Sequence, residues 1–199
     1  MSDNLVTSEF RVSYPNLFVP VPKDRNNPES KKVYQLSMLF PPRTELKETA
    51  LEEYDTFMTK AKAAAQAAAK EKWGDKIPTN LKSPFLDQGN YDQAGYNKGA
   101  VLIRTSSGTA PSCVDAQVQK IMDSSEIYPG CYGRASVRAY AYGGAGTTFS
   151  PGISFGLGNF QKTRDGESLG GRTRAEDDFT PVAGGATADP VTSTDSIFG

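Results

Sequence analysis

The stretch YPGCYGRASVRAYAY, residues 128–142, alternates two kinds of side chain. From Cys131 onward every second residue is small or β-branched, and those between are Tyr132, Arg134, Ser136, Arg138, Tyr140 and Tyr142. A period of two is typical of a β-strand whose faces have different surroundings. We therefore predict a strand whose small residues pack inside a tightly curved sheet, with its tyrosines and arginines facing outward.

Other segments share this period and are also predicted strands: residues 7–18, 33–40, 100–106 and 153–164. In the first of them, Phe10, Val12 and Tyr14 form the apolar row, and Pro15 is expected to end the strand. Five strands of this length provide enough apolar residues for one core.

Residues 44–73 carry the strongest helix signal. Alanine is abundant, and acidic residues precede lysines, which is the order that the helix dipole favours. Thr44 is a candidate N-cap and Gly74 a candidate C-cap. A short helix is also predicted over residues 112–122, where Ser and Asp form a variant of the capping box.

The predicted order is three strands, a short helix and two strands, with the long helix inserted between strands two and three. This is the layout of the OB-fold, a partly open Greek-key barrel that binds oligonucleotides across one face. We expect a mainly β protein with helices (α+β): one five-stranded OB-fold barrel domain over about residues 5–165, with the inserted helix at about 44–73. Residues 166–199 lose all periodicity, so a flexible, disordered acidic tail is expected.

The chain has no histidine, which excludes Ser-His-Asp and Cys-His catalysis and His-ligated zinc. The G-x-S-x-G match at residues 152–156 therefore has no possible base, and no helix pattern follows it. Cys113 and Cys131 have no metal-ligand spacing and are interpreted as buried thiols. We expect no catalytic residues, no cofactor and no metal.

No segment reaches the roughly 18 consecutive apolar residues of a membrane-spanning helix, and the first ten residues do not resemble a signal peptide. A cytoplasmic protein without a membrane partner is expected. The net charge of −1 is distributed unevenly along the chain. Residues 1–174 carry 22 Lys and Arg against 18 acidic residues, a net of +4, whereas residues 175–199 carry five acidic residues and no cation.

The outward face of the strand at residues 132–142 combines cations with aromatic rings. Binding of single-stranded nucleic acid requires both, because cations follow the phosphates and rings stack on bases. The predicted DNA-binding residues are those of this strand and cations expected beside it: Tyr132, Arg134, Arg138, Tyr140, Tyr142, Arg104, Lys162, Arg164, Lys31 and Lys32. The alternative is structural, since exposed Tyr and Arg also reflect β propensity, and some rings could pack under the long helix.

Three segments resemble a family of bacteriophage proteins: KAAAQAAAKEKWG (62–74), IYPGCYGRASVRAYAY (127–142) and GISFGLGNFQKTRDGESLGG (152–171). The family, formerly known only as a domain of unknown function, comprises OB-fold single-stranded DNA-binding proteins of phage replication. The resemblance covers about residues 8–171. It implies sequence-independent binding of single strands, no enzymatic activity and no metal.

The C-terminus ends in DSIFG, residues 195–199. Single-stranded DNA-binding proteins of bacteria and phages often end in acidic residues and a hydrophobic tip that recruits replication enzymes. This resemblance implies a tail that binds phage or host replication proteins through Asp177, Asp178, Asp195, Ile197 and Phe198. The chain departs from the pattern because its acidic residues are sparse and Gly199 follows Phe198, so an inert end is the alternative.

The sequence thus predicts a sequence-independent single-stranded DNA-binding protein. It would protect single strands and hold them open during phage DNA replication or recombination, in the cytoplasm of the infected bacterial host. One alternative is a phage structural or subunit-interaction protein that uses the same Tyr/Arg face. Another is a metal-dependent nuclease with Asp87, Asp92, Asp165 and Glu167, although these carboxylates lie in Gly-rich turns where acidic residues are common.

Overall fold

The structure, a computed structural model, describes residues 4–170. The tail residues singled out above, from Asp177 to Phe198, therefore lie outside the described residues. The strands and the α-helix are β1 (Leu5–Val6), β2 (Phe10–Pro22), β3 (Lys32–Leu39), α1 (Glu48–Trp73), β4 (Leu86–Asp87), β5 (Val101–Ser107), β6 (Cys113–Val114), β7 (Tyr132–Tyr142) and β8 (Gly152–Arg164). None of the helices in this range is long and apolar enough to cross a membrane.

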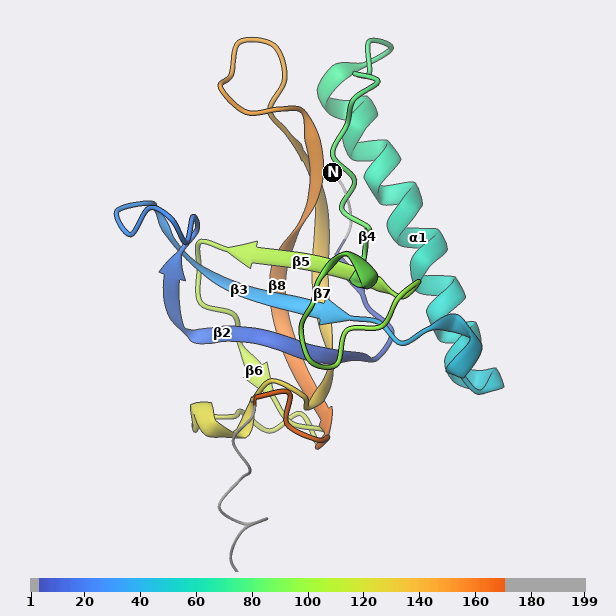
Figure 1. The fold of residues 1–199 in the computed structure, drawn as a ribbon, viewed down its shortest axis with the longest axis vertical. Coiled ribbons are helices and arrows are strands. Elements are labelled where there is room, and N and C mark those ends of the chain that lie inside the picture. Colours follow the sequence, from blue (N-terminus) through green and yellow to red (C-terminus); the bar gives the residue numbers. More distant parts are fainter. Residues whose placement is uncertain (1–3, 171–199) are drawn as a thin grey trace, which may run out of the picture.

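Five long strands close into a barrel in the order β7-β2-β3-β5-β8, and pairing between β7 and β8 completes the ring (Figure 1). Neighbouring strands are antiparallel except β5 and β8, which are parallel. The long helix α1 follows the second barrel strand, as expected. The predicted OB-like barrel with an inserted helix is confirmed.

Strand β7 has the two faces that its alternation predicts. Ala135, Val137 and Ala139 are buried, whereas Arg138 and Tyr140 are exposed. The inner row is small because large rings from other strands fill the barrel. A Cβ atom at Gly133, for example, would overlap the Phe160 ring. The small residues of β7 therefore make room for a core built around phenylalanines.

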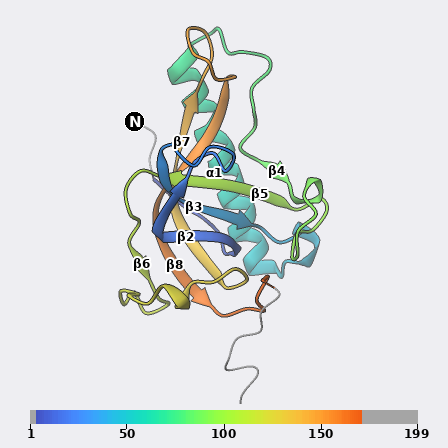
Figure 2. The same cartoon turned by 60° about the vertical axis from the view of Figure 1, so that its left-hand side comes forward.

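Helix α1 runs along the β7–β8 hairpin, which projects beyond the rest of the barrel (Figure 1 and Figure 2). Ala61 and Ala68 of α1 share the core with Ala139 of β7, so small side chains on both elements allow close packing. The helix ends at Gly74, which has φ 59° and is the predicted C-cap.

The predicted N-cap at Thr44 is wrong. The helix starts later, with Lys47 at the N-cap position, and no side chain caps its first turn. Thr44 instead lies in a short 3-10 helix, Arg43–Glu45, that follows the Pro41–Pro42 pair. Because each proline fixes its own φ angle and disfavours the α conformation in the residue before it, the chain leaves β3 in an extended path before α1 begins.

Two further expectations need correction. Strand β2 continues through Pro15 to Pro22, because within the described residues it pairs only with β3 beyond Val12, and prolines are tolerated on such an edge. The short helix predicted over residues 112–122 is absent. That segment contains β6 and a tight turn in which the Asp115 carboxylate accepts the N–H groups of Gln117 and Gln119, a local hydrogen-bonding pattern that competes with a helix.

Candidate nucleic-acid interface

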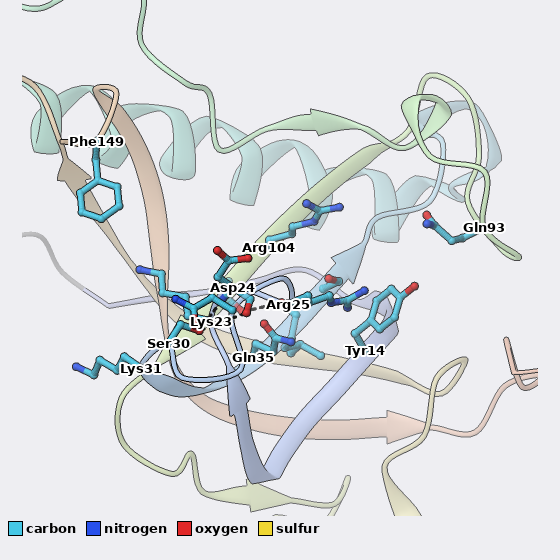
Figure 3. A pocket seen from close by; sticks show the side chains of 14 residues that line it. Tyr14, Lys23, Asp24, Arg25, Ser30, Lys31, Gln35, Gln93, Arg104 and Phe149 are labelled. Atoms are coloured by element: carbon cyan, nitrogen blue, oxygen red, sulfur yellow. Dashed lines mark hydrogen bonds between the residues drawn. The ribbon is translucent and has the colours of Figure 1, made fainter.

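A groove of about 870 Å³ lies on the outer face of β3 and β5 (Figure 3). Its floor includes Gln35 and Ser37 from β3 and Arg104 from β5. The β2–β3 connection, residues 23–31, forms one wall, and the β7–β8 connection, residues 143–151, contributes Phe149. This strand pair and these two connections are the surface that OB-folds use to bind oligonucleotides.

The groove is strongly cationic. Four cations line it, Lys23, Arg25, Lys31 and Arg104, against the single acidic residue Asp24. None of the four forms an ion pair with another residue in the described part of the chain. Their charge is therefore available to phosphates, and the lining carries a net of +3.

Aromatic rings accompany these cations. Phe149 is 71% exposed and Tyr14 is 38% exposed, and both line the groove. The guanidinium of Arg25 lies 4.5 Å from the centre of the Tyr14 ring, and that of Arg104 lies 4.6 Å from the centre of the Tyr91 ring. Cations next to exposed rings are the combination that single-stranded nucleic acid requires.

Tyr14 reaches the groove because the backbone is distorted. Strict alternation would place it in the core with Val12, as the sequence predicted, and this prediction is wrong. The β2–β3 register shifts between Ser13 and Asn16, and Tyr14 has φ 48°, in the left-handed region. Such a bulge re-aims a side chain at a cost of about 1–3 kcal/mol of backbone strain.

The loop between β4 and β5 closes one end of the groove. The buried amide of Gln88 donates from Nε2 to the carbonyls of Phe40 and Val101, at 2.7 and 2.8 Å, and accepts the Asn97 N–H at 3.0 Å. These bonds fix the loop that carries Tyr91 and Gln93.

Asp87 secures the start of the same loop. Its carboxylate accepts the N–H groups of Gly89 and Gly99, at 2.8 and 3.0 Å. Hydrogen bonds to the charged form favour it, so the Gly89 N–H first, and then the Gly99 N–H, lower the pKa of Asp87.

The structure separates the predicted DNA-binding residues into three groups. Arg104 and Lys31 line the groove, and Lys32 is the exposed first residue of β3 beside it. The Lys and Arg of the β2–β3 connection were visible in the sequence as a basic turn-rich segment. Tyr14, Tyr91 and Phe149 were not predicted as site residues. Of the three, only Phe149 gave a signal in the sequence, because it is a large aromatic residue within a glycine-rich connection.

A second group lies on the projecting part of β7. Arg138 and Tyr140 are exposed, Tyr142 is half-buried, and the two tyrosine rings lie 6.3 Å apart. Strand register connects this surface with the groove. Gln35 of β3 pairs with Ser106 of β5, Ser106 with Gly156 of β8, and Gly156 with Arg138. The outer sheet surface is therefore continuous from the groove to this group.

The third group lies at the opposite end of β7 and β8, where its cations already have partners. Arg134 contacts Glu53 of α1 at 2.8 Å, and Lys162 contacts Asp165 at 2.8 Å. Arg164 contacts Glu9 at 2.8 Å and lies 3.4 Å from the centre of the Tyr132 ring. Their charges are compensated, and one face of Tyr132 is covered.

Two of the four carboxylates considered for a nuclease have other partners, since Asp87 secures a loop and Asp165 contacts Lys162. Across residues 4–170, no group of three or more His, Cys, Asp or Glu side chains is placed to hold a metal ion. Both cysteines are buried and form no disulfide. Burial raises the pKa of the Cys113 thiol to about 11 and is also the main cause of the raised pKa of Cys131.

An OB-like barrel with a cationic, ring-lined groove over β3 and β5 defines the class of OB-fold nucleic-acid-binding proteins. The chain belongs to the family of the single-stranded DNA-binding protein of Enterobacter phage Enc34, whose family model matches residues 3–191. This is a phage family of single-stranded DNA-binding proteins, not of enzymes, as the sequence resemblance implied. No curated protein matches the chain significantly.

Solved structures agree with the fold. The bacteriophage Enc34 protein in complex with ssDNA has a TM-score of 0.65 and 17% identity, covering 84% of this chain and 89% of that chain. Its C-terminal truncation has a TM-score of 0.60 and 18% identity, covering 83% and 87%. Bacteriophage T7 gp2.5, a single-stranded DNA-binding protein, has a TM-score of 0.55 and 12% identity, covering 87% and 98%. At these identities the likeness concerns the fold alone.

Proposed function

We propose that this protein binds single-stranded DNA, without base specificity, in the groove over β3 and β5. One observation carries the proposal: four cations without ion-pair partners and two exposed rings line the same groove. Cations attract phosphates of any sequence, and rings stack on any base. Family membership and the relative crystallised with ssDNA support the same ligand.

The role of this binding is protection of single strands, which also keeps them from pairing again during phage DNA replication or recombination in the host cytoplasm. Stacking requires exposed bases, so duplex DNA can use only the phosphate contacts. Preference for single strands is therefore the property on which the role depends.

The DNA path extends from the groove onto the projecting part of β7. Arg138, Tyr140 and Tyr142 offer a cation and two rings on the continuous outer surface. Contacts to Tyr132, Arg134, Lys162 and Arg164 require phosphates to displace the carboxylates that now pair with these cations. They are therefore peripheral contacts, and Lys32 acts at the edge of the groove.

The C-terminal tail is proposed to bind replication proteins through its acidic residues and its Ile197–Phe198 tip. Five acidic residues without a cation would also compete with DNA for the basic groove. Deletion of residues 175–199 should then tighten DNA binding at low salt, with a gain that shrinks as salt screens the attraction. An unchanged affinity at low salt would rule out this competition, and a pull-down with a Phe198→Ala variant tests the docking role separately.

A titration of labelled single-stranded and duplex oligonucleotides of equal length, over a range of salt, tests the proposed function. Affinity for single strands should be higher, largely independent of sequence, and should fall with salt. Lys23→Ala combined with Lys31→Ala should make the slope of log K against log salt concentration shallower, by about 0.7 for each phosphate that the variant no longer neutralises. Lys60→Ala combined with Lys62→Ala, on the exposed side of α1, is the control with the same charge change. Equal affinity for duplex, or equal effects of both variants, would refute the groove as the site.

A further inference from the structure

The last residue of α1 touches the connection that carries Phe149. A Cβ atom built on Gly144 would lie 3.0 Å from Nε1 of Trp73, so the Gly144 backbone lies directly against the indole ring. Gly144 has φ 96°, a conformation that favours glycine. The helix therefore reaches along the whole projecting hairpin and supports its tip.

Local hydrogen bonds within the 143–151 connection link this contact to Phe149. The Phe149 carbonyl accepts the Gly144 N–H at 3.1 Å and the Thr147 hydroxyl at 3.2 Å. The Thr147 hydroxyl also donates to the Gly144 carbonyl at 2.9 Å. These bonds hold the Gly144 and Phe149 backbones together, and the Phe149 side chain lines the groove.

Little else fixes this tip. Within the described residues, every hydrogen bond of residues 143–150 stays inside the connection. The neighbouring Lys82 bonds to Pro151 and Ile153, which lie closer to the barrel. The Trp73 contact is therefore positioned to determine how the tip lies over the groove.

We propose that Trp73 is a positioning residue for DNA binding. It supports the 143–151 connection so that the Phe149 ring faces the groove, ready to stack on a base, and it acts through Phe149 without contacting DNA itself. The proposal rests on the proposed function, since it assigns a cause to the placement of one groove ring. It also explains why α1 extends as far as the hairpin tip.

A double-mutant cycle tests this coupling. Phe149→Ala should weaken binding of a single-stranded oligonucleotide about fivefold or more, through loss of one stack. Trp73→Ala should weaken it by a smaller factor, and Trp73→Phe should restore most of the loss. In the Phe149→Ala background, Trp73→Ala should have no further effect. An equal loss in both backgrounds, or no loss in a folded Trp73→Ala protein, would overturn the proposal.

Glycine variants repeat the test without removing the tryptophan. Gly144→Ala and Gly146→Ala both place a side chain at positive φ, 96° and 81°, but a Cβ at Gly146 meets nothing within 4 Å. Gly144→Ala alone should displace the tip from Trp73 and weaken binding through Phe149. Equal effects of the two variants would mean that backbone strain, and not the contact with Trp73, determines the result.

Fluorescence provides a readout that does not depend on affinity. Trp73 is the only tryptophan in the chain, so its accessibility to acrylamide reports the contact directly. Quenching should increase in Gly144→Ala and stay unchanged in Gly146→Ala, whether or not the protein binds DNA. Failure of the wild type to bind DNA would refute the proposed function, whereas unchanged quenching in Gly144→Ala would refute the contact. Strong quenching of Trp73 by DNA in the Phe149→Ala variant would show bases on the indole and overturn the positioning role.

Discussion

Tyr14 allows stability and binding to be tested at one residue. Its φ of 48° is in the left-handed region, where a residue with a Cβ atom is strained by about 1–2 kcal/mol and glycine is not. Tyr14→Ala and Tyr14→Gly both remove the ring and its burial. Their difference therefore isolates the backbone. In an ordinary strand, glycine is less stable than alanine by about 0.5–1 kcal/mol.

At Tyr14 this order should reverse. Relief of about 1–2 kcal/mol of strain exceeds the entropic cost of glycine, which leaves Tyr14→Gly more stable than Tyr14→Ala by about 0.5–1 kcal/mol. For a chain of this length, such a difference raises Tm by about 1–4 °C. Both variants should lose one base stack, about 1–3 kcal/mol, and bind single-stranded DNA roughly 5- to 150-fold more weakly.

Thermal melts and oligonucleotide titrations of the two variants measure both effects. Val118 is the matched control, because it has φ 63° and is 68% exposed in the turn after β6, and it does not line the groove. Val118→Gly should also be more stable than Val118→Ala, with unchanged DNA affinity. If Tyr14→Ala melts above Tyr14→Gly, the bulge is absent in solution. If both Tyr14 variants bind as the wild type does, its ring is not a stacking platform.

Other predictions concern single groups. Arg138→Ala should make the slope of log K against log salt concentration shallower by about 0.7. Arg134→Ala should change this slope less, because Arg134 is already ion-paired. Titrations in which Arg134→Ala has the larger effect would contradict this. Because hydrogen bonds lower the folded pKa of Asp87, its stabilising effect is present above the ordinary value of 3.8 and is lost as pH falls through the lowered pKa. Asp87→Ala should therefore lose less stability than the wild type on acidification below that value, as measured by denaturant unfolding. Cys113 and Cys131 should react with a thiol reagent at neutral pH only after unfolding, since burial raises both pKa values; rapid reaction of the folded protein would contradict their burial.

Local sequence patterns predicted most of the barrel. The strict alternation of residues 132–142 required two different faces, and the alanine-rich segment ending at Gly74 required a long helix. The order of the five strands and the long helix then indicated an OB-like barrel, although the short helix predicted between strands three and four is absent. Tyr14 shows the limit of this reasoning. Periodicity cannot detect a bulge, and a non-glycine residue with positive φ gives no signal in its own sequence.

The candidate site depends on contacts between distant parts of the chain. Arg134 and Glu53 are 81 residues apart, and Arg164 and Glu9 are 155 apart, so the sequence could not show that these cations are neutralised. The groove has the same origin. Lys31, Arg104 and Phe149 meet because β5 lies between β3 and β8 in the sheet, and that adjacency is set by topology and not by any one segment.

The charge order of α1 explains why the two ends of β7 differ. Residues 48–55 carry four acidic residues and no cation, whereas residues 60–73 carry four lysines and one glutamate. The acidic end lies beside the start of β7, where Glu53 pairs with Arg134. The basic end lies beside the projecting hairpin, where Lys72 and Arg138 line the same hollow. The order that suits the helix dipole therefore also places Lys72 beside Arg138 at the hairpin, in a hollow that Glu71 lines as well. Reversing the charge order of α1 would oppose the helix dipole, remove the Glu53–Arg134 ion pair and place acidic side chains beside Arg138. One sequence pattern therefore serves both the stability of the helix and its charge contacts with β7.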